Sequence, residues 1–321
     1  MKGIVDVSVI IPAYNVEKYI EDCLRSVLSQ TVKPKEIIVV NDGSSDTTLA
    51  LVKQYENEYD NIRCISKQNA GLSDARNSGI RVATSKYIAF LDSDDLWHPT
   101  KLAKQLDLFD DDNLELGLVY SAYELCDQNS QPTTGIIIDP CIKGDALEHL
   151  IEKGNLISGS GSGVLIKRSV FEDVGEFDIS LRYAEDLDMW IRIAEKYHVD
   201  FVDEVLVIIR THSDSMQAQY TSHYTKFLAN WPLYSKHSGY FTRKDMLKNL
   251  RFNAVNAALE STLRGVHYQK MTPIRHIKML MLGKNRFFNS SFTLYIVLMK
   301  CLARRVANKL HVIREMYFAK N

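Results

Sequence analysis

Three carboxylates follow a short apolar stretch at the end of the first third of the chain. Residues 87–91 read Tyr-Ile-Ala-Phe-Leu, which is typical of a buried strand, and Asp92, Asp94 and Asp95 come directly after it. Two like charges about 4 Å apart repel by ~1 kcal/mol in water and by ~4 kcal/mol in a partly screened site. A cation offsets this repulsion, and an all-oxygen ligand set suits Mg²⁺ or Mn²⁺. Taken alone, the segment can also be a solvated acidic turn before a helix.

Polar residues also follow two earlier predicted strands. Residues 7–11 form a β-branched run, and Tyr14 and Asn15 come after it. Residues 36–40 form a second run, which ends in a turn that contains Asp42. Helical patterns separate these strands, so we expect right-handed crossovers and a mostly parallel sheet flanked by helices, which is the α/β class. Ligands of such sheets bind beyond the carboxyl ends of the strands, so the three polar segments are expected at one edge.

Hydrophobic periodicity and turn residues predict the remaining elements. Asn15 is expected to cap the first helix, and residues 127–144, which contain two prolines and two glycines, are expected to form a loop. The expected strands are residues 7–11, 36–40, 62–65, 87–91, 116–123, 164–166 and 201–209, and the expected helices are residues 16–30, 46–59, 73–83, 99–109, 169–174 and 187–194.

Composition is ordinary for a soluble globular protein with two domains, or with one large domain and an appendage. The 321 residues are 45% hydrophobic and 25% charged. The five cysteines are scattered and include no Cys-x-x-Cys pair, so we expect reduced thiols in a cytoplasmic protein. No signal peptide is expected before the first strand, and no stretch reaches the ~18 uninterrupted apolar residues of a membrane span.

The net charge of −1 hides a division between two parts of the chain. Residues 221–321 carry 18 Lys and Arg against 3 Asp and Glu, whereas the first 220 residues carry 21 basic and 37 acidic residues. We therefore expect one domain at residues 1–220 and a helical, basic region at residues 221–321. Three roles stay open for this region: contact of residues 270–321 with an anionic membrane at its inner face, acceptor docking, and homo-oligomerisation. Nucleic acid is disfavoured because no binding motif accompanies the charge.

A glycine-rich run at residues 159–163 raises the question of a dinucleotide-binding loop. Such a loop needs a third glycine at a fixed offset, where this chain has Val164 and Ile166. The first strand is followed by Pro-Ala-Tyr-Asn rather than by glycines, which argues against a Rossmann dehydrogenase and a P-loop enzyme. A loop that closely approaches another segment, or that lines an acceptor site, fits the run better.

Five segments together resemble the inverting family 2 glycosyltransferases of GT-A fold. They are residues 8–15, 39–46, 69–79, 90–95 and 185–186. The resemblance spans roughly residues 5–215 and implies a GT-A catalytic domain. It also implies transfer of a hexose from a nucleotide-sugar, expected to be a UDP-sugar, to a glycan or lipid-linked saccharide, as in bacterial surface polysaccharide assembly.

The resemblance implies a role for each matching position. Asp186 would be the general base, supported by Glu185. Asp94 and Asp92 would hold Mn²⁺ or Mg²⁺, with His212 as a further metal or diphosphate contact. Tyr14 would lie against the nucleotide base, Asp42 would accept a hydrogen bond from it, and Asp95 would position the donor sugar. The full set expected to bind the nucleotide-sugar is Pro12, Tyr14, Asn15, Asp42, Arg76, Asp92 and Asp95.

The implied chemistry needs these residue types. The leaving group is a nucleoside diphosphate, so a divalent ion must neutralise the charge that builds on the bridging oxygen. The acceptor hydroxyl is a poor nucleophile near neutral pH, so a carboxylate must take its proton during attack.

Two alternative functions stay open. A sugar-nucleotide pyrophosphorylase would need a Gly-rich loop after the first strand, and a catalytically inactive nucleotide-sugar-binding module would not need Asp186.

Overall fold

The computed structural model describes residues 3–110, 112–138, 141–155, 157, 161–213, 215–216 and 223–240. The chain divides into two compact units, residues 1–215 and residues 216–321. The expected site residues all belong to the first unit, and of the second the structure describes one helix, α8 (His223–Lys236). The expectations of a basic helical region and of docking through residues 270–321 fall almost wholly outside the described residues and stay predictions. Within those residues, no helix is both long and apolar enough to cross a bilayer.

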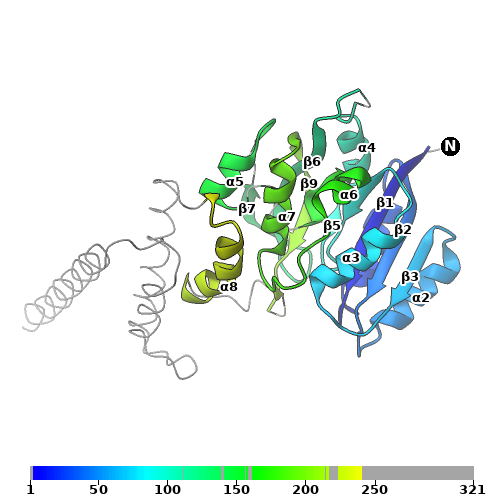
Figure 1. Cartoon of the computed structure of the whole chain (residues 1–321). Helices are drawn as coiled ribbons and strands as arrows, with labels where there is room; N and C mark the ends of the chain where they lie inside the picture. The colour runs from blue at the N-terminus through cyan, green and yellow to red at the C-terminus, as the bar shows by residue number, and fades with distance from the viewer. Residues whose placement is uncertain are drawn as a thin grey trace, which may run out of the picture. The chain divides into compact units, whose positions relative to one another are not determined.

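Strands and helices alternate along the first unit, as the periodicity predicts (Figure 1). The strands are β1 (Ile4–Ala13), β2 (Lys33–Asn41), β3 (Ile62–Ser66), β4 (Tyr87–Phe90), β5 (Leu96–Trp97), β6 (Leu116–Cys126), β7 (Pro132–Ile138), β8 (Leu165–Lys167) and β9 (His198–Arg210). The helices are α1 (Ile20–Leu28), α2 (Thr48–Glu58), α3 (Leu72–Val82), α4 (Lys101–Leu106), α5 (Leu147–Lys153), α6 (Arg168–Val174) and α7 (Glu185–Ala194), and residues Gly161–Gly163 form a 3₁₀ turn.

In the part of the chain that the structure describes, nine strands form one mixed sheet in the order β3-β2-β1-β4-β8-β6-β9-β5, and β7 pairs with β6. The pairs β1–β2, β1–β4, β2–β3 and β6–β9 are parallel, and the pairs that involve β5, β7 or β8 are antiparallel. Figure 1 shows β1, β2 and β3 side by side, with α2 and α3 beside them. Because β1, β2 and β4 run in the same direction, the segments that follow them leave the sheet at one edge, as expected.

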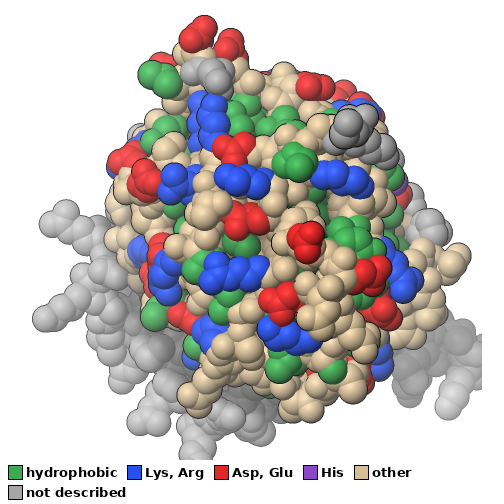
Figure 2. All heavy atoms as spheres, turned by 90° about the vertical axis from the view of Figure 1, so that its right-hand side faces the viewer, with side chains coloured by type: hydrophobic (Ala, Val, Ile, Leu, Met, Phe, Trp, Pro, Cys, Tyr) green, Lys and Arg blue, Asp and Glu red, His purple; other side chains and the backbone are tan. Residues whose placement is uncertain are grey.

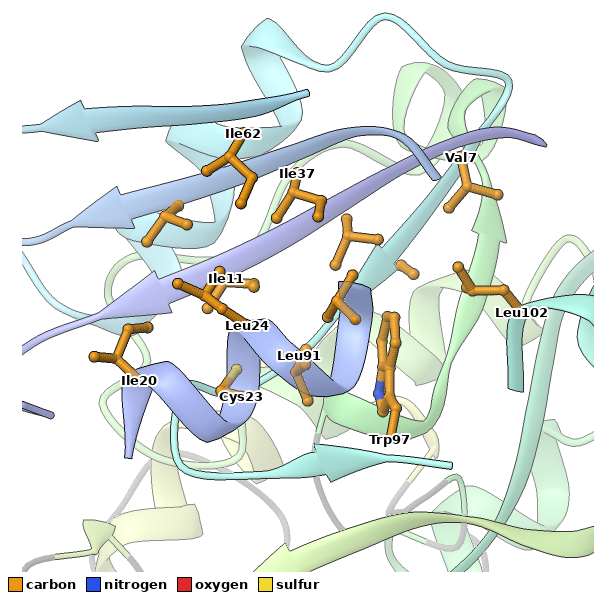
Figure 3. Close-up of a cluster of buried hydrophobic side chains, with 14 of the residues drawn as sticks. Val7, Ile11, Ile20, Cys23, Leu24, Ile37, Ile62, Leu91, Trp97 and Leu102 are labelled. Carbon is orange, nitrogen blue, oxygen red and sulfur yellow. The ribbon is translucent and has the colours of Figure 1, made fainter. Parts of the chain in front are cut away.

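Helices cover both faces of the sheet. Successive side chains of β1 point to opposite faces, so some pack against α1 and others against α3. Val7, Val9 and Ile11 share a buried cluster with apolar side chains of α1 (Figure 3). Ile10 points to the other face, where α3 approaches so closely that a Cβ atom at Gly79 would collide with it. The sheet is therefore buried on both sides, which is why its central strands are almost continuously apolar.

The first helix differs from its expected bounds. It begins at Ile20 rather than at residue 16, and Asn15 does not cap it. Asn15 takes a φ of 51°, and its Oδ1 accepts hydrogen bonds from the backbone N–H and the hydroxyl of Ser45. The Asn15 side chain therefore connects the segment after β1 to the segment after β2 and does not cap the helix, which starts only after the chain has turned.

Three further elements were not predicted. Residues 132–138 form β7 rather than a loop, because pairing with β6 outweighs the glycine and places Pro132 at the first strand position, where it is tolerated. The two-residue β5 is held by pairing with β9, and α5 has only seven residues. The two residues of β5 are too few for a periodic signal.

The face shown in Figure 2 mixes Lys and Arg with Asp and Glu. Hydrophobic side chains on this face are scattered between the charged groups and form no large patch. Such a surface is ordinary for a face that meets solvent.

Candidate active site

The acidic turn after β4 is held by contacts from other segments. Asp95 is 2% exposed; its Oδ2 accepts a hydrogen bond from the Ser162 hydroxyl at 2.6 Å, and its Oδ1 accepts one from the Arg210 backbone N–H at 3.0 Å. The Ser162 hydroxyl also accepts the Asp92 backbone N–H at 3.0 Å. Burial, followed by the charges of Asp94 and Asp92, raises the pKa of Asp95 well above its ordinary value. Asp95 fixes the turn, and its expected contact with the donor sugar stays a prediction.

Asp94 and His212 face each other beside this turn. Asp94 Oδ2 lies 2.9 Å from His212 Nε2, and the Tyr19 ring lies 4.9 Å from the imidazole, centroid to centroid. Arg210 donates from Nε to the Asp94 carbonyl at 2.9 Å, and its Cζ lies 4.7 Å from the centre of the Tyr19 ring. The end of β9 therefore brings His212 to the acidic turn, 118 residues from Asp94 in sequence.

Asp94 and His212 fit a divalent ion as two of its ligands. Two ligands about 2.1 Å from an octahedral ion lie about 3 Å apart, and Oδ2 and Nε2 are 2.9 Å apart. Nε2 is the nitrogen of His212 that faces Asp94, and Nδ1 is buried without a hydrogen-bond partner among the described residues. No group of three or more His, Cys, Asp or Glu residues is arranged for a metal in the described part of the chain. Two protein ligands are what Mg²⁺ or Mn²⁺ needs when phosphate oxygens complete its shell, and the imidazole favours Mn²⁺.

Arg76 joins the acidic turn to the start of α7. Its guanidinium is 1% exposed and donates from Nη2 to Asp92 Oδ1 at 2.8 Å and from Nη1 to Glu185 Oε1 at 2.9 Å. Phe177 packs 5.3 Å from Cζ, and a Cβ atom at Gly161 would stand 3.0 Å from Nη2. Burial acts to lower the pKa of Arg76, but the two carboxylates outweigh it and raise the pKa above its ordinary value. The glycine run thus approaches another segment closely, and the expected contact of Arg76 with base or phosphates stays a prediction.

Asp186 occupies the first turn of α7. Its Oδ1 accepts the Leu187 backbone N–H at 2.7 Å, and its Oδ2 accepts the Asn155 Nδ2–H at 2.6 Å. Part of its surface stays open to solvent. Dense surroundings, followed by the charge of Glu185, nevertheless raise the pKa of Asp186 from 3.8 to about 7, while Arg76 acts to lower it. A carboxylate whose pKa lies near neutral pH is suited to general base catalysis.

Asp42 is buried against the loop that precedes α3. Its Oδ2 accepts the Gly71 backbone N–H at 2.8 Å, its Oδ1 accepts the Ala70 backbone N–H at 3.0 Å, and the Lys67 ammonium pairs with Oδ1. These bonds fasten the loop to the end of β2. The expected hydrogen bond from a nucleotide base to Asp42 stays a prediction.

The residues at the end of β1 and just after it differ in their exposure and contacts. Pro12 is buried within β1, and Asn15 is bonded to the turn after β2 through Ser44 as well as Ser45. Tyr14 is 50% exposed and is among the few large hydrophobic side chains that lie open. Its ring is therefore free to stack on a flat ligand, whereas Pro12 and Asn15 shape the loop that carries it.

Three residues that hold the site were missed by the sequence reasoning. Ser162 carried a signal, because it stands between two glycines in a run that indicated close approach. Arg210 follows the predicted strand 201–209 and stands two residues before His212, and this position could have indicated that Arg210 belongs to the site. Asn155 follows a glycine at the end of a short helix, and nothing in the sequence pattern distinguishes it.

The chain belongs to family 2 of the glycosyl transferases. Residues 8–175 match the model described as Glycosyl transferase family 2, and this confirms the family that the motifs indicate. The match includes the segments after β1, β2 and β4 and ends before Glu185 and Asp186.

Curated relatives carry glycosyltransferase names. The uncharacterized glycosyltransferase RP339 of Rickettsia prowazekii is 36% identical over 210 residues, which are 64% of this chain and 64% of that one. An uncharacterized glycosyltransferase of Rickettsia bellii is 33% identical over 246 residues, which are 75% of this chain and 34% of that one. TuaG of Bacillus subtilis, named for teichuronic acid biosynthesis, is 34% identical over 192 residues, or 59% and 72% of the two chains. The chain thus spans between a third and just under two thirds of the two Rickettsia relatives.

Solved structures share the fold. TarS residues 1–349 of S. aureus, in complex with UDP-GlcNAc, gives a TM-score of 0.56 at 20% identity over 87% of this chain and 76% of that one. The mannosyltransferase PcManGT from Pyrobaculum calidifontis, in complex with GDP-Man and Mn²⁺, gives a TM-score of 0.54 at 16% identity over 95% and 88%. The expected α/β fold of GT-A type, with its mostly parallel sheet, is confirmed.

Proposed function

We propose that this chain is a metal-dependent, inverting glycosyltransferase of the hexosyltransferase type. It moves a sugar from a nucleotide-sugar, expected to be a UDP-sugar, to a glycan or lipid-linked saccharide in surface polysaccharide assembly. The observation that carries the proposal is the Arg76 bridge, since one guanidinium is bonded to Asp92 at 2.8 Å and to Glu185 at 2.9 Å. The bridge makes the acidic turn and the neighbourhood of Asp186 parts of one site. The nucleotide-sugar complexes of TarS and PcManGT and the name of TuaG support the substrate class.

On the donor side, the chain supplies an exposed ring and an acidic turn. Tyr14 stacks on the nucleotide base, and Asp92 lies towards the ribose. Asp94, Asp92 and His212 are the residues that would hold the divalent ion. The ion supplies positive charge that stabilises a diphosphate leaving group.

On the acceptor side, Asp186 is the base. It takes the proton of the attacking hydroxyl, so the oxygen gains nucleophilicity as its bond to the anomeric carbon forms. The bond from that carbon to the diphosphate breaks on the opposite face, and a single displacement of this kind inverts the anomeric centre. Peripheral contact of residues 270–321 with an anionic membrane, as proposed from the charge pattern, would bring a lipid-linked acceptor to this base.

Metal removal tests the proposed function. We expect that chelation lowers nucleoside diphosphate release from a panel of UDP- and GDP-sugars by at least ~100-fold, because Lewis-acid stabilisation is worth several kcal/mol. Added Mn²⁺ should restore release. Asp94→Asn should imitate chelation, whereas Asp60→Asn, an equal charge change at an exposed residue, should not. Undiminished release under chelation contradicts metal dependence, and no release from any donor with Mn²⁺ favours the inactive binding module.

The pH dependence of turnover tests the role of Asp186. Because the base must be deprotonated, kcat/KM should rise with pH and reach half its plateau near pH 7, where Asp186 titrates. Glu185→Gln removes a negative charge that raises the pKa of Asp186, so the rising limb should move to lower pH. Glu172→Gln makes the same change at an exposed ion pair on α6 and should leave the profile in place. A profile unmoved by Glu185→Gln would argue that another group limits the rate.

A further inference from the structure

Asn155 contacts the proposed base from outside its helix. It follows Gly154, which ends α5 with a φ of 86°, and α5 packs against α7. Asn155 Nδ2 lies 2.6 Å from Asp186 Oδ2, so the amide donates a direct hydrogen bond to the carboxyl group. The second residue after the end of α5 therefore contacts the proposed base directly.

Only the donor half of the Asn155 amide is used in this contact. Its Oδ1 is buried, and no hydrogen-bond donor reaches it in the described part of the structure. A buried acceptor without a donor is destabilising, because it has lost its hydrogen bond to water. Rotation of the amide by 180° exchanges oxygen and nitrogen in nearly the same space, and here that rotation breaks no bond to Oδ1. The amide is thus able to present either a donor or an acceptor to Asp186.

Asp186 needs both kinds of partner. Burial, followed by Glu185, raises its pKa to about 7, so the charged and neutral forms are both populated near neutral pH. The charged and titratable groups that face it are Glu185 on α7, Arg76 on α3, Asp92 after β4 and Tyr123 on β6. Glu185 and Asp92 are already bonded to Arg76. A carboxylate accepts hydrogen bonds only, whereas a carboxylic acid also donates one.

We propose that Asn155 is a positioning residue that serves Asp186 in both of its protonation states. Nδ2 donates to the carboxylate before transfer, and after rotation of the amide Oδ1 accepts a hydrogen bond from the carboxylic acid that transfer produces. The inference rests on the proposed function, in which Asp186 is the base.

The proton balance of the step is simple. The acceptor O–H bond breaks, its proton goes to the Asp186 carboxylate, and an oxygen electron pair forms the bond to the anomeric carbon. The bond from that carbon to the diphosphate oxygen breaks, and its electron pair leaves with the nucleoside diphosphate. The new carboxylic O–H donates to Asn155 Oδ1 until solvent removes the proton and the amide returns.

Two substitutions separate this role from packing alone. Asn155→Leu keeps the approximate volume but removes donor and acceptor, whereas Asn155→Asp keeps the shape and places a charge beside the carboxylate. Asn155→Asp should raise the pKa of Asp186 because it places a second negative charge beside the carboxylate, whereas Asn155→Leu removes a partner from both protonation states and should move the pKa less. Both should lower kcat by about 10–100-fold through loss of base geometry, with the donor KM within about twofold of wild type. Lys153→Ala, at an exposed residue two positions earlier, is the matched control and should change neither quantity.

Nuclear magnetic resonance of the full chain without substrate is the decisive measurement. The Asn155 side-chain amide signal, assigned by its loss in Asn155→Leu, should shift with pH at the midpoint of Asp186 and should cease to shift in Asp186→Asn. An amide signal that does not titrate, or an Asp186 midpoint equal in wild type and both Asn155 variants, overturns the inference. If the amide titrates as expected but no nucleotide-sugar is turned over, the contact stands and the proposed function fails, so the two failures are distinguishable.

Discussion

Asp186→Asn is expected to lower the rate of donor turnover by about 10²–10⁴-fold, which is the usual contribution of a general base. The substitution removes the group that takes the proton and leaves Asp94, His212 and Tyr14 unchanged. The donor should therefore still bind with Mn²⁺ at close to wild-type affinity. The fold should also persist, because an asparagine oxygen can still accept the Leu187 backbone N–H.

Two measurements on the same protein check this result: nucleoside diphosphate release for the rate, and calorimetric titration of donor for the affinity. Glu195→Gln is the control, since it neutralises an exposed carboxylate just after α7. If Asp186→Asn keeps most of the wild-type rate, Asp186 is not the base. If it loses donor affinity as well, the residue acts on the donor side rather than on the acceptor.

Arg76→Leu is expected to have the largest effect on stability. The guanidinium is 1% exposed and pairs with Asp92 and Glu185, so its loss leaves two carboxylates without their cation. Breaking a buried ion pair by removing one partner costs about 3–5 kcal/mol. For a unit of this size, that corresponds to a fall in Tm on the order of 10 °C.

A matched ion pair on the same helix provides the control. Arg81 pairs with Glu176 through two hydrogen bonds, but its side chain is 53% exposed. Arg81→Leu should therefore cost no more than about 1 kcal/mol. Urea unfolding of both variants gives the comparison, and an equal loss in the two would mean that the Arg76 bridge does not hold the site together.

The sequence alone predicted the polar ends of β1, β2 and β4 and their meeting at one edge. This worked because a buried parallel strand must be apolar on both faces, so its end is marked where polar residues resume. The same local reasoning failed at β5, β7 and α5. The conformation of these elements is decided by the neighbours with which they pair or pack.

Only the tertiary structure decided which charged groups share a site. Arg76 and Glu185 are separated by 109 residues, and Asp94 and His212 by 118. No periodicity reports a contact over such distances, because it depends on where each strand enters the sheet. Burial is likewise a property of the assembled fold. Asp42, Asp95 and Arg76 are buried and make their hydrogen bonds within the protein, whereas the Tyr14 ring is exposed to solvent. The packing of α5 against α7 places Asn155 against the carboxylate of Asp186.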